Sequence, residues 1–276
     1  MSGSCQAFVF VGGSHRSGTS PLTGWLSEHS LVSAFTDTGV PEDEGQHLQS
    51  VIPTAGQAGG IGRFGYSPSG HLTEGSALAT AASRERLLGQ WARHWDLSKP
   101  RLLEKSPPNL VRARFLQALF PNSYFVMVIR HPVAVITALE RWHGAPKPLK
   151  AYRLLRHWAY CYETMLRDAR NVEKLRLVRY EDMVAAPEPQ IESIHRFIGL
   201  VPELGSRSAK SGLNERYFDV WARRRRRPVQ GWYLDAVSRG LEHRVRVFGY
   251  SLADPDAAPA PHPLVAQLMR AKTYEH

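Results

Sequence analysis

The stretch that decides the fold is FVFVGGSHRSGTS, residues 8–20. The four apolar residues at its start, 8–11, predict a short buried strand, and the polar turn after them leads into a segment with helical spacing, residues 21–26. A strand, a Gly/Ser/Thr loop and a helix start together form a cradle for an anion. The loop amides point inward and the helix N-terminus carries a partial positive charge. We therefore predict a phosphate-binding loop.

The loop departs from the triphosphate-binding pattern G-x-x-x-x-G-K-[ST] at one position. The frame fits from Gly13 to Gly18 and at Ser20, but Thr19 stands where the lysine belongs and the basic residue, Arg16, comes earlier. In triphosphatases that lysine reaches the terminal phosphates. Its absence disfavours triphosphate chemistry and leaves a cradle for a single phosphate, with a glycine-rich turn that binds nothing as the alternative.

Composition sets broad limits on the fold and the ligand. The 276 residues suffice for one domain with a full core. The net charge of +10 suits a nucleotide, an acidic glycan or a nucleic acid, although a basic surface also serves solubility. Two cysteines, Cys5 and Cys161, disfavour a disulfide framework and a cysteine zinc site. No apolar run approaches the ~20 residues of a membrane span and no leader pattern begins the chain, so we expect a cytoplasmic protein without a membrane partner.

Expected strands and helices alternate along the chain. After the first strand and a helix over residues 19–28, strands are expected at 101–104, 124–129 and 175–179, and helices at 76–95, 109–120, 133–142, 148–171, 189–198 and 230–248. Residues 31–75 are a long irregular segment, 213–227 are mixed, and 254–276 are expected to be a flexible tail. The alternation predicts a single α/β domain, 1–276, with three α/β/α layers around a mostly parallel sheet.

Three cationic residues fall at the carboxyl ends of the expected strands, where ligands gather in such sheets. They are Arg16, Lys105 and Arg130. A triphosphatase would end the hydrophobic strand 124–129 on an aspartate that supports magnesium, whereas an arginine contacts a phosphate directly and in bidentate fashion. These departures predict a nucleotide with two separate phosphate groups, bound without a metal ion.

Together these motifs resemble the sulfotransferases that use 3′-phosphoadenosine 5′-phosphosulfate (PAPS). Residues 13–20 resemble the loop that binds the 5′-phosphosulfate, and residues 128–135, VIRHPVAV, resemble the segment that binds the 3′-phosphate. Residues 104–107, EKSP, are similar to a Lys-[ST]-Pro segment near the transferred group, and residues 179–183, RYEDM, to a recurring segment of the fold. The resemblance implies a sulfotransferase fold, similar to that of P-loop nucleotide triphosphatases, and sulfuryl transfer from PAPS to a hydroxyl or amine.

The resemblance also implies a donor site. Its loop residues are Gly13, Ser14, His15, Arg16, Ser17, Gly18, Thr19 and Ser20. Arg130 is expected at the 3′-phosphate; family members add a serine eight residues later, but that position here is Ala138, and Thr137 is a candidate replacement. In the family a basic segment near the C-terminus closes over the nucleotide, which is one interpretation of Arg223, Arg224, Arg225, Arg226 and Arg227; a solvated patch is the other.

For catalysis, the resemblance implies that Arg16 and the loop amides hold the leaving group and that Lys105 faces the sulfonate. The base that takes the acceptor proton is expected after the first helix, with Glu44 favoured and His47 second, while His15 is expected to shape the loop. A solvated loop is the alternative for the acids.

The acceptor is the least specified part of the prediction. We expect a small molecule or natural product, with a glycan also open, in a pocket shaped by residues 31–75 and 148–171. The aromatic residues Trp142, Tyr152 and Trp158 are candidates to line it or to belong to the core. A small-molecule or nucleotide kinase and a basic nucleic-acid-binding protein are the rival hypotheses, the latter without a recognisable nucleic-acid module. The sequence does not predict an oligomeric state.

Overall fold

The computed structural model describes residues 6–142, 150–203, 205 and 212–270 of the chain, without the side chains of 141 and 142. Three features singled out in the sequence therefore lie outside the described residues: Cys5, the side chain of Trp142, and the last residues of the expected tail, 271–276.

A five-stranded parallel sheet forms the centre of the molecule. Its order is β2 (Val32–Ala34), β3 (Arg101–Lys105), β1 (Ala7–Gly13), β4 (Ser123–Ile129) and β5 (Leu175–Arg179). Every residue of β1, β3 and β4 is buried, as is usual for parallel strands covered on both faces. The expected α/β class and parallel sheet are confirmed.

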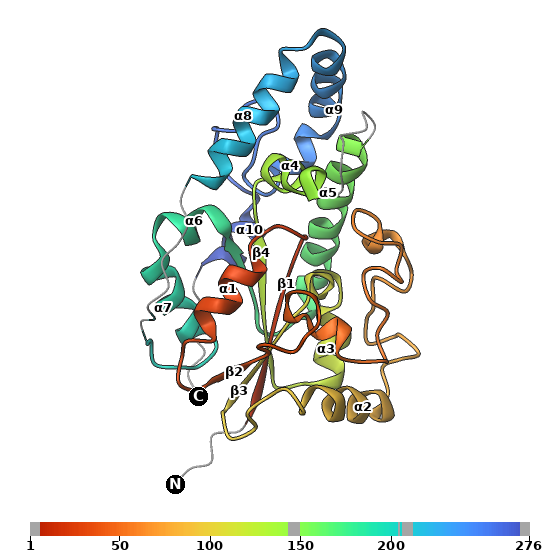
Figure 1. Cartoon of the computed structure of the whole chain (residues 1–276), viewed down its shortest axis with the longest axis vertical. Helices are drawn as coiled ribbons and strands as arrows, with labels where there is room; N and C mark the ends of the chain where they lie inside the picture. The colour runs from red at the N-terminus through yellow and green to blue at the C-terminus, as the bar shows by residue number, and fades with distance from the viewer. Residues whose placement is uncertain (1–5, 143–149, 204, 206–211, 271–276) are drawn as a thin grey trace.

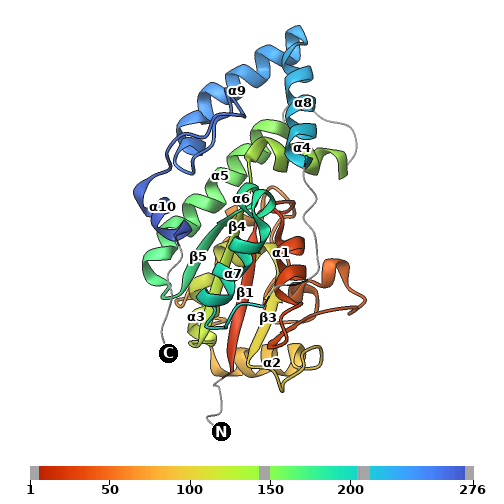
Figure 2. The same ribbon diagram turned by 90° about the vertical axis from the view of Figure 1, so that its left-hand side faces the viewer.

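Side-chain alternation along β1 divides the core between the two faces of the sheet. Val9 and Val11 pack with helices α1 (Thr19–Leu26), α6 (Tyr180–Ala185) and α7 (Pro187–Phe197), while Phe8 and Phe10 join the larger cluster under α2 (Ala81–Trp91), α3 (Ala113–Leu119) and α5 (Lys150–Asp168). The chain thus forms helix, sheet and helix layers (Figures 1 and 2).

Further helices lie at the carboxyl ends of the strands. Helix α4 (Pro132–Trp142) follows β4, and α8 (Leu213–Arg225) packs against α4 and α9 (Pro228–Arg246). In Figure 2 these helices lie at the end of the molecule opposite the N-terminus.

The structure differs from the sequence prediction in several elements. It adds β2 and α6, turns the mixed segment into α8, and moves Lys105 from a loop to the last residue of β3. The expected helix from residue 109 begins instead with a 3₁₀ turn, Pro107–Val111. The segment expected to be a flexible tail contains helix α10 (Pro263–Met269), because the side chain of Val265 is buried in the larger core cluster.

The long segment 31–75 has little regular structure beyond β2 and three 3₁₀ turns, Pro41–Asp43, Gly45–His47 and Phe64–Tyr66. It is nevertheless anchored in the core, since apolar side chains along it are buried, including Phe35, Ile52, Phe64 and Leu72. This anchoring fixes the turns that carry Glu42 and Glu44.

Candidate active site

The loop between β1 and α1 is held in a shape that glycine alone permits at Gly18. This residue has φ +106°, and a Cβ atom there would lie 2.4 Å from the ring of Tyr180. Helix α1 starts at the next residue without a side-chain cap. Its first amides are therefore left to face whatever anion the loop holds.

The beginning of the loop is tied to its neighbours. The amide of Ser14 donates to the Tyr162 hydroxyl (3.1 Å), which itself donates to the carbonyl of Val128 on β4 (2.6 Å). Gly13 has no space for a side chain, because a Cβ atom would lie 2.7 Å from that same carbonyl. Gly13, Ser14 and Ser17 thus shape the loop without lining the cavity beside it.

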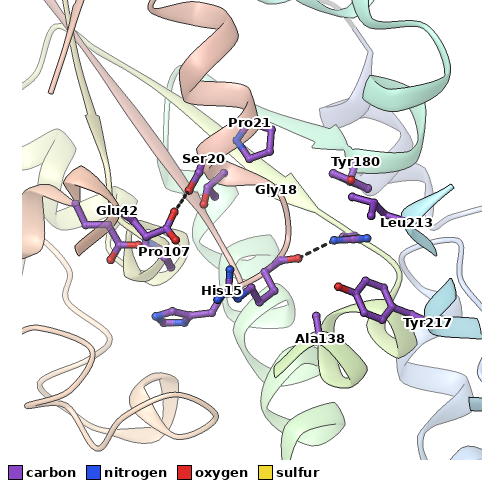
Figure 3. A pocket seen from close by; sticks show the side chains of 14 residues that line it. His15, Gly18, Ser20, Pro21, Glu42, Pro107, Ala138, Tyr180, Leu213 and Tyr217 are labelled. Atoms are coloured by element: carbon purple, nitrogen blue, oxygen red, sulfur yellow. Dashed lines mark hydrogen bonds between the residues drawn. The ribbon is translucent and has the colours of Figure 1, made fainter. Parts of the chain in front are cut away.

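A cavity of about 330 Å³ opens between this loop, α4, α6 and α8 (Figure 3). Several residues of the predicted site line this cavity: residues of the loop, the favoured base Glu44, and Arg130 directly after β4. Its lining residues are His15, Arg16, Gly18, Thr19, Ser20, Pro21, Glu42, Glu44, Pro107, Arg130, Ala138, Tyr180, Leu213 and Tyr217.

Arg130 is a buried cation with one unsatisfied donor. Its guanidinium lies 4.0 Å from the ring centre of Tyr180 and 5.4 Å from that of Tyr217, and the residue is 5% exposed. Nε donates to Asn214 Oδ1 (2.8 Å) and Nη1 to the carbonyl of Arg16 (3.2 Å), while buried Nη2 has no hydrogen-bond partner among the described residues. Burial lowers the pKa of this arginine, with tyrosine and glutamate charges opposing the shift. A buried donor of this kind is available to an acceptor on a ligand.

Lys105 lies beside the loop rather than in the cavity lining. Its ammonium, 3% exposed, donates to the Ser20 hydroxyl (3.3 Å) and to the carbonyl of Glu42 (2.5 Å), and it pairs with Glu44 Oε1 at 3.5 Å. Ser20 in turn donates to the Glu42 carboxylate at 2.9 Å (Figure 3). The predicted cation is thus within hydrogen-bond reach of both the phosphate loop and the predicted base.

Glu44 and His47, the two candidate bases, occupy different places. Glu44 is 8% exposed and lines the cavity; burial raises the pKa of its carboxyl, an effect that Lys105, Gln46 and His47 oppose. His47 is exposed and lines a separate hollow formed by residues of the 46–57 region, with its Nε2 3.8 Å from Glu44 Oε2. Of the two candidates, Glu44 is the one that lines the cavity.

Thr137 and the arginine run are not among the residues that line the cavity. Thr137 is fully buried and its hydroxyl has no partner in the described part of the chain; Ala138 faces the cavity instead, because one residue turns a helix face by about 100°. In the run 223–227, Arg224 pairs with Glu140 and Arg225 with Asp235 (2.6 Å), while the other three arginines are exposed. These contacts fix α8 to its surroundings.

Two of the aromatic residues considered for an acceptor pocket or for the core are not among the residues that line this cavity. Trp158 belongs to the core, packed 4.7 Å from the ring of Tyr162, and Tyr152 is 42% exposed away from the cavity lining. The tyrosines that line this cavity are Tyr180 and Tyr217. Tyr180 falls in the RYEDM motif, which offered a signal, whereas Tyr217 comes from α8, for which the sequence offered none.

Two absences hold among the residues that the structure describes. None of the helices there combines the length and the apolar character needed to cross a bilayer. Within the same residues, no three His, Cys, Asp or Glu side chains are grouped as metal ligands would be.

Comparisons with known proteins extend this geometry. The chain is 27% identical over 204 residues to protein-tyrosine sulfotransferase 2 of Gallus gallus, a match that covers 70% of this chain and 51% of that protein. It is 29% identical over 203 residues to a putative protein-tyrosine sulfotransferase of Caenorhabditis briggsae, covering 71% of this chain and 66% of that one. The chain therefore spans about half the length of the first of these relatives.

The fold agrees with a solved structure and with a family profile. The crystal structure of sulfotransferase STF9 from Mycobacterium avium superimposes with a TM-score of 0.51 at 14% identity, over 92% of this chain and 79% of that one, which supports the fold alone. The sequence profile of the sulfotransferase family matches residues 8–203. With the profile covering most of the chain and all five strands, the chain belongs to the sulfotransferase family.

Proposed function

We propose that this protein transfers the sulfuryl group of PAPS to a hydroxyl group, or an amine, of an acceptor. The observation that carries the proposal is the buried, unsatisfied Nη2 of Arg130, a residue that lines the same cavity as the loop with the shape of an anion cradle. A ligand with two separate phosphate groups would engage both features at once.

The residues present fit such a donor. The amides of residues 16–20 and the Arg16 side chain would hold the 5′-phosphosulfate, and Arg130 would hold the 3′-phosphate. Pro21, Tyr180 and Tyr217 offer apolar and aromatic surface between these two sites, suited to the adenine ring. No step of this binding mode requires a metal ligand from the chain.

Transfer then needs a base and a cation at the sulfonate. The bond between sulfur and the bridging phosphate oxygen breaks as a bond from the acceptor oxygen to sulfur forms, and Glu44 takes the acceptor proton. The raised pKa of buried Glu44 brings it closer to neutral pH, which improves a carboxylate as a base. Lys105, 3.5 Å from Glu44 Oε1, stabilises charge on the sulfonate oxygens and on the leaving oxygen.

Two acceptor classes deserve testing. The relatives named protein-tyrosine sulfotransferases favour a tyrosine phenol in a polypeptide, and a small molecule, natural product or glycan stays a prediction. A cytoplasmic location stays a prediction, as does the absence of a nucleic-acid partner.

The proposal is tested by incubating the protein with sulfur-labelled PAPS and a panel of phenols, alcohols and tyrosine peptides. We expect label transfer that is lost in Lys105→Ala. Magnesium-dependent phosphoryl transfer from ATP, with no transfer from PAPS, would refute the proposal in favour of the kinase hypothesis.

A further inference from the structure

Gln46 is a buried residue next to the proposed base, and both ends of its side-chain amide are hydrogen-bonded to other residues of the chain. It is 5% exposed. Its side-chain Nε2 donates to Glu44 Oε2, and its side-chain Oε1 accepts from the backbone amide of Ala55 (2.7 Å). The backbone amide of Gln46 donates to the Ser106 hydroxyl (2.9 Å). With both ends of its amide group engaged, the side chain has one orientation available to it.

This orientation determines which oxygen of Glu44 is left for chemistry. Gln46 holds Oε2, and Lys105 Nζ lies 3.5 Å from the other oxygen, Oε1. Other titratable groups lie close to the same carboxylate: His47 Nε2 lies 3.8 Å from Oε2, and the buried carboxyl of Glu104 interacts with Glu44 electrostatically. The hydrogen bond from Gln46 lowers the pKa of Glu44 against the effect of burial.

Gln46 is itself anchored to the strand that carries Lys105. The Ser106 hydroxyl donates to Glu104 Oε1 (2.6 Å) while it accepts from the Gln46 amide, and Asn109 Nδ2 donates to Glu104 Oε2 (2.5 Å). Gly45 lies directly on the Glu104 carboxylate, since a Cβ atom there would be 2.4 Å from Oε1. The chain Glu104, Ser106 and Gln46 thus links β3 to the turn that bears Glu44.

We propose that Gln46 is a positioning residue for transfer: it fixes Glu44 with Oε1 toward Lys105, and Glu104 and Ser106 fix Gln46. This inference rests on the proposed role of Glu44 as the base. Gln46 touches neither acceptor nor donor in this scheme and acts through Glu44 alone, so its loss should leave donor binding intact while impairing turnover.

The matched pair of variants is Gln46→Met and Gln49→Met. Gln49 stands in the same segment and bonds only to backbone groups, those of Gln46, Val51 and Ile52. We expect Gln46→Met to lower kcat by about 10- to 100-fold, as for a misplaced catalytic group, and to move the acid limb of the kcat/KM profile to higher pH. Gln49→Met should leave that limb in place. An unchanged limb in Gln46→Met overturns the inference.

A second measurement does not depend on turnover. Unfolding temperatures of Gln46→Met, Glu44→Ala and the double variant should be non-additive, because the two side chains share a hydrogen bond. Additive shifts would show that Gln46 does not hold Glu44, and the inference would be wrong whatever the activity. Non-additive shifts in a protein that neither binds nor uses PAPS would support the contact but refute the proposed function, and with it the catalytic role.

Discussion

Replacing Arg130 tests the central feature of the donor site. Its guanidinium is fixed by the rings of Tyr180 and Tyr217, by Asn214 and by the carbonyl of Arg16, which leaves Nη2 for a ligand. If Nη2 binds the 3′-phosphate, Arg130→Ala should weaken the binding of adenosine 3′,5′-bisphosphate, which is what remains of the proposed donor after transfer. Binding of adenosine 5′-monophosphate, which has no 3′-phosphate, should change much less.

The size of the effect follows from the burial of the arginine. A hydrogen bond to a charged group contributes about 1.5–3 kcal/mol, and a factor of ten in affinity corresponds to about 1.4 kcal/mol. We therefore expect the bisphosphate to bind about 10- to 100-fold more weakly to the variant. Arg130→Lys keeps the charge without the planar fork and should fall between the parent and Arg130→Ala.

Titration calorimetry with both nucleotides, on parent and variants, measures the preference for the bisphosphate as a ratio. The ratio corrects for a general loss of stability, which removal of a buried arginine will cause. Arg16→Ala is the matched control, because it should weaken the binding of both nucleotides through the 5′-phosphate they share. If Arg130→Ala lowers the affinity for the two nucleotides equally, Arg130 does not contact a 3′-phosphate and the prediction of a two-phosphate site is wrong.

Three further predictions follow from the buried charges. Glu44→Gln should lower turnover by about 10²–10⁴-fold with bisphosphate binding retained; near-parental turnover would assign the base elsewhere. Burial raises the pKa of Glu104 from 4.5 to about 7, so its contribution to stability is present below pH 4.5 and is lost as pH rises through 7. In Glu104→Gln the unfolding temperature should therefore fall less than in the parent between these pH values, and parallel curves would contradict this. Arg224→Ala should destabilise the fold by about 3–5 kcal/mol in chemical denaturation, since buried Glu140 loses its cation, whereas exposed Arg223→Ala should cost under about 0.5 kcal/mol; equal effects would refute the distinction.

Much of the fold could be predicted because local patterns determine it. Residues 124–129 are a run of apolar and aromatic side chains that suits a parallel strand, and residues 175–179, LRLVR, are apolar at three of five positions. The structure places β4 and β5 there. Strand β2 could not be found this way. It has three residues, Val32–Ala34, and forms because its backbone pairs with β3, which is a long-range contact.

The site divides in the same manner. The end of a parallel strand fixes which edge of the sheet a residue reaches, so Arg16, Lys105 and Arg130 could be brought together from sequence. The direction in which a helical side chain points depends on how the helix is rotated about its axis. The sequence pattern around Thr137 does not specify that rotation. The structure shows that the cavity receives Ala138 and that the Thr137 hydroxyl is buried.

The arginine run shows why charge alone is a weak guide to a binding site. Three of the five adjacent cations lie in the last turn of α8 and the other two follow its end, so no single helix face can direct them all at one ligand. Here Arg224 and Arg225 find carboxylates on α4 and α9 and hold α8 in place. The same helix presents Leu213 and Tyr217 to the cavity and Asn214 to the guanidinium of Arg130. The run thus acts on the proposed donor site indirectly, by fixing the helix whose other end orients Arg130.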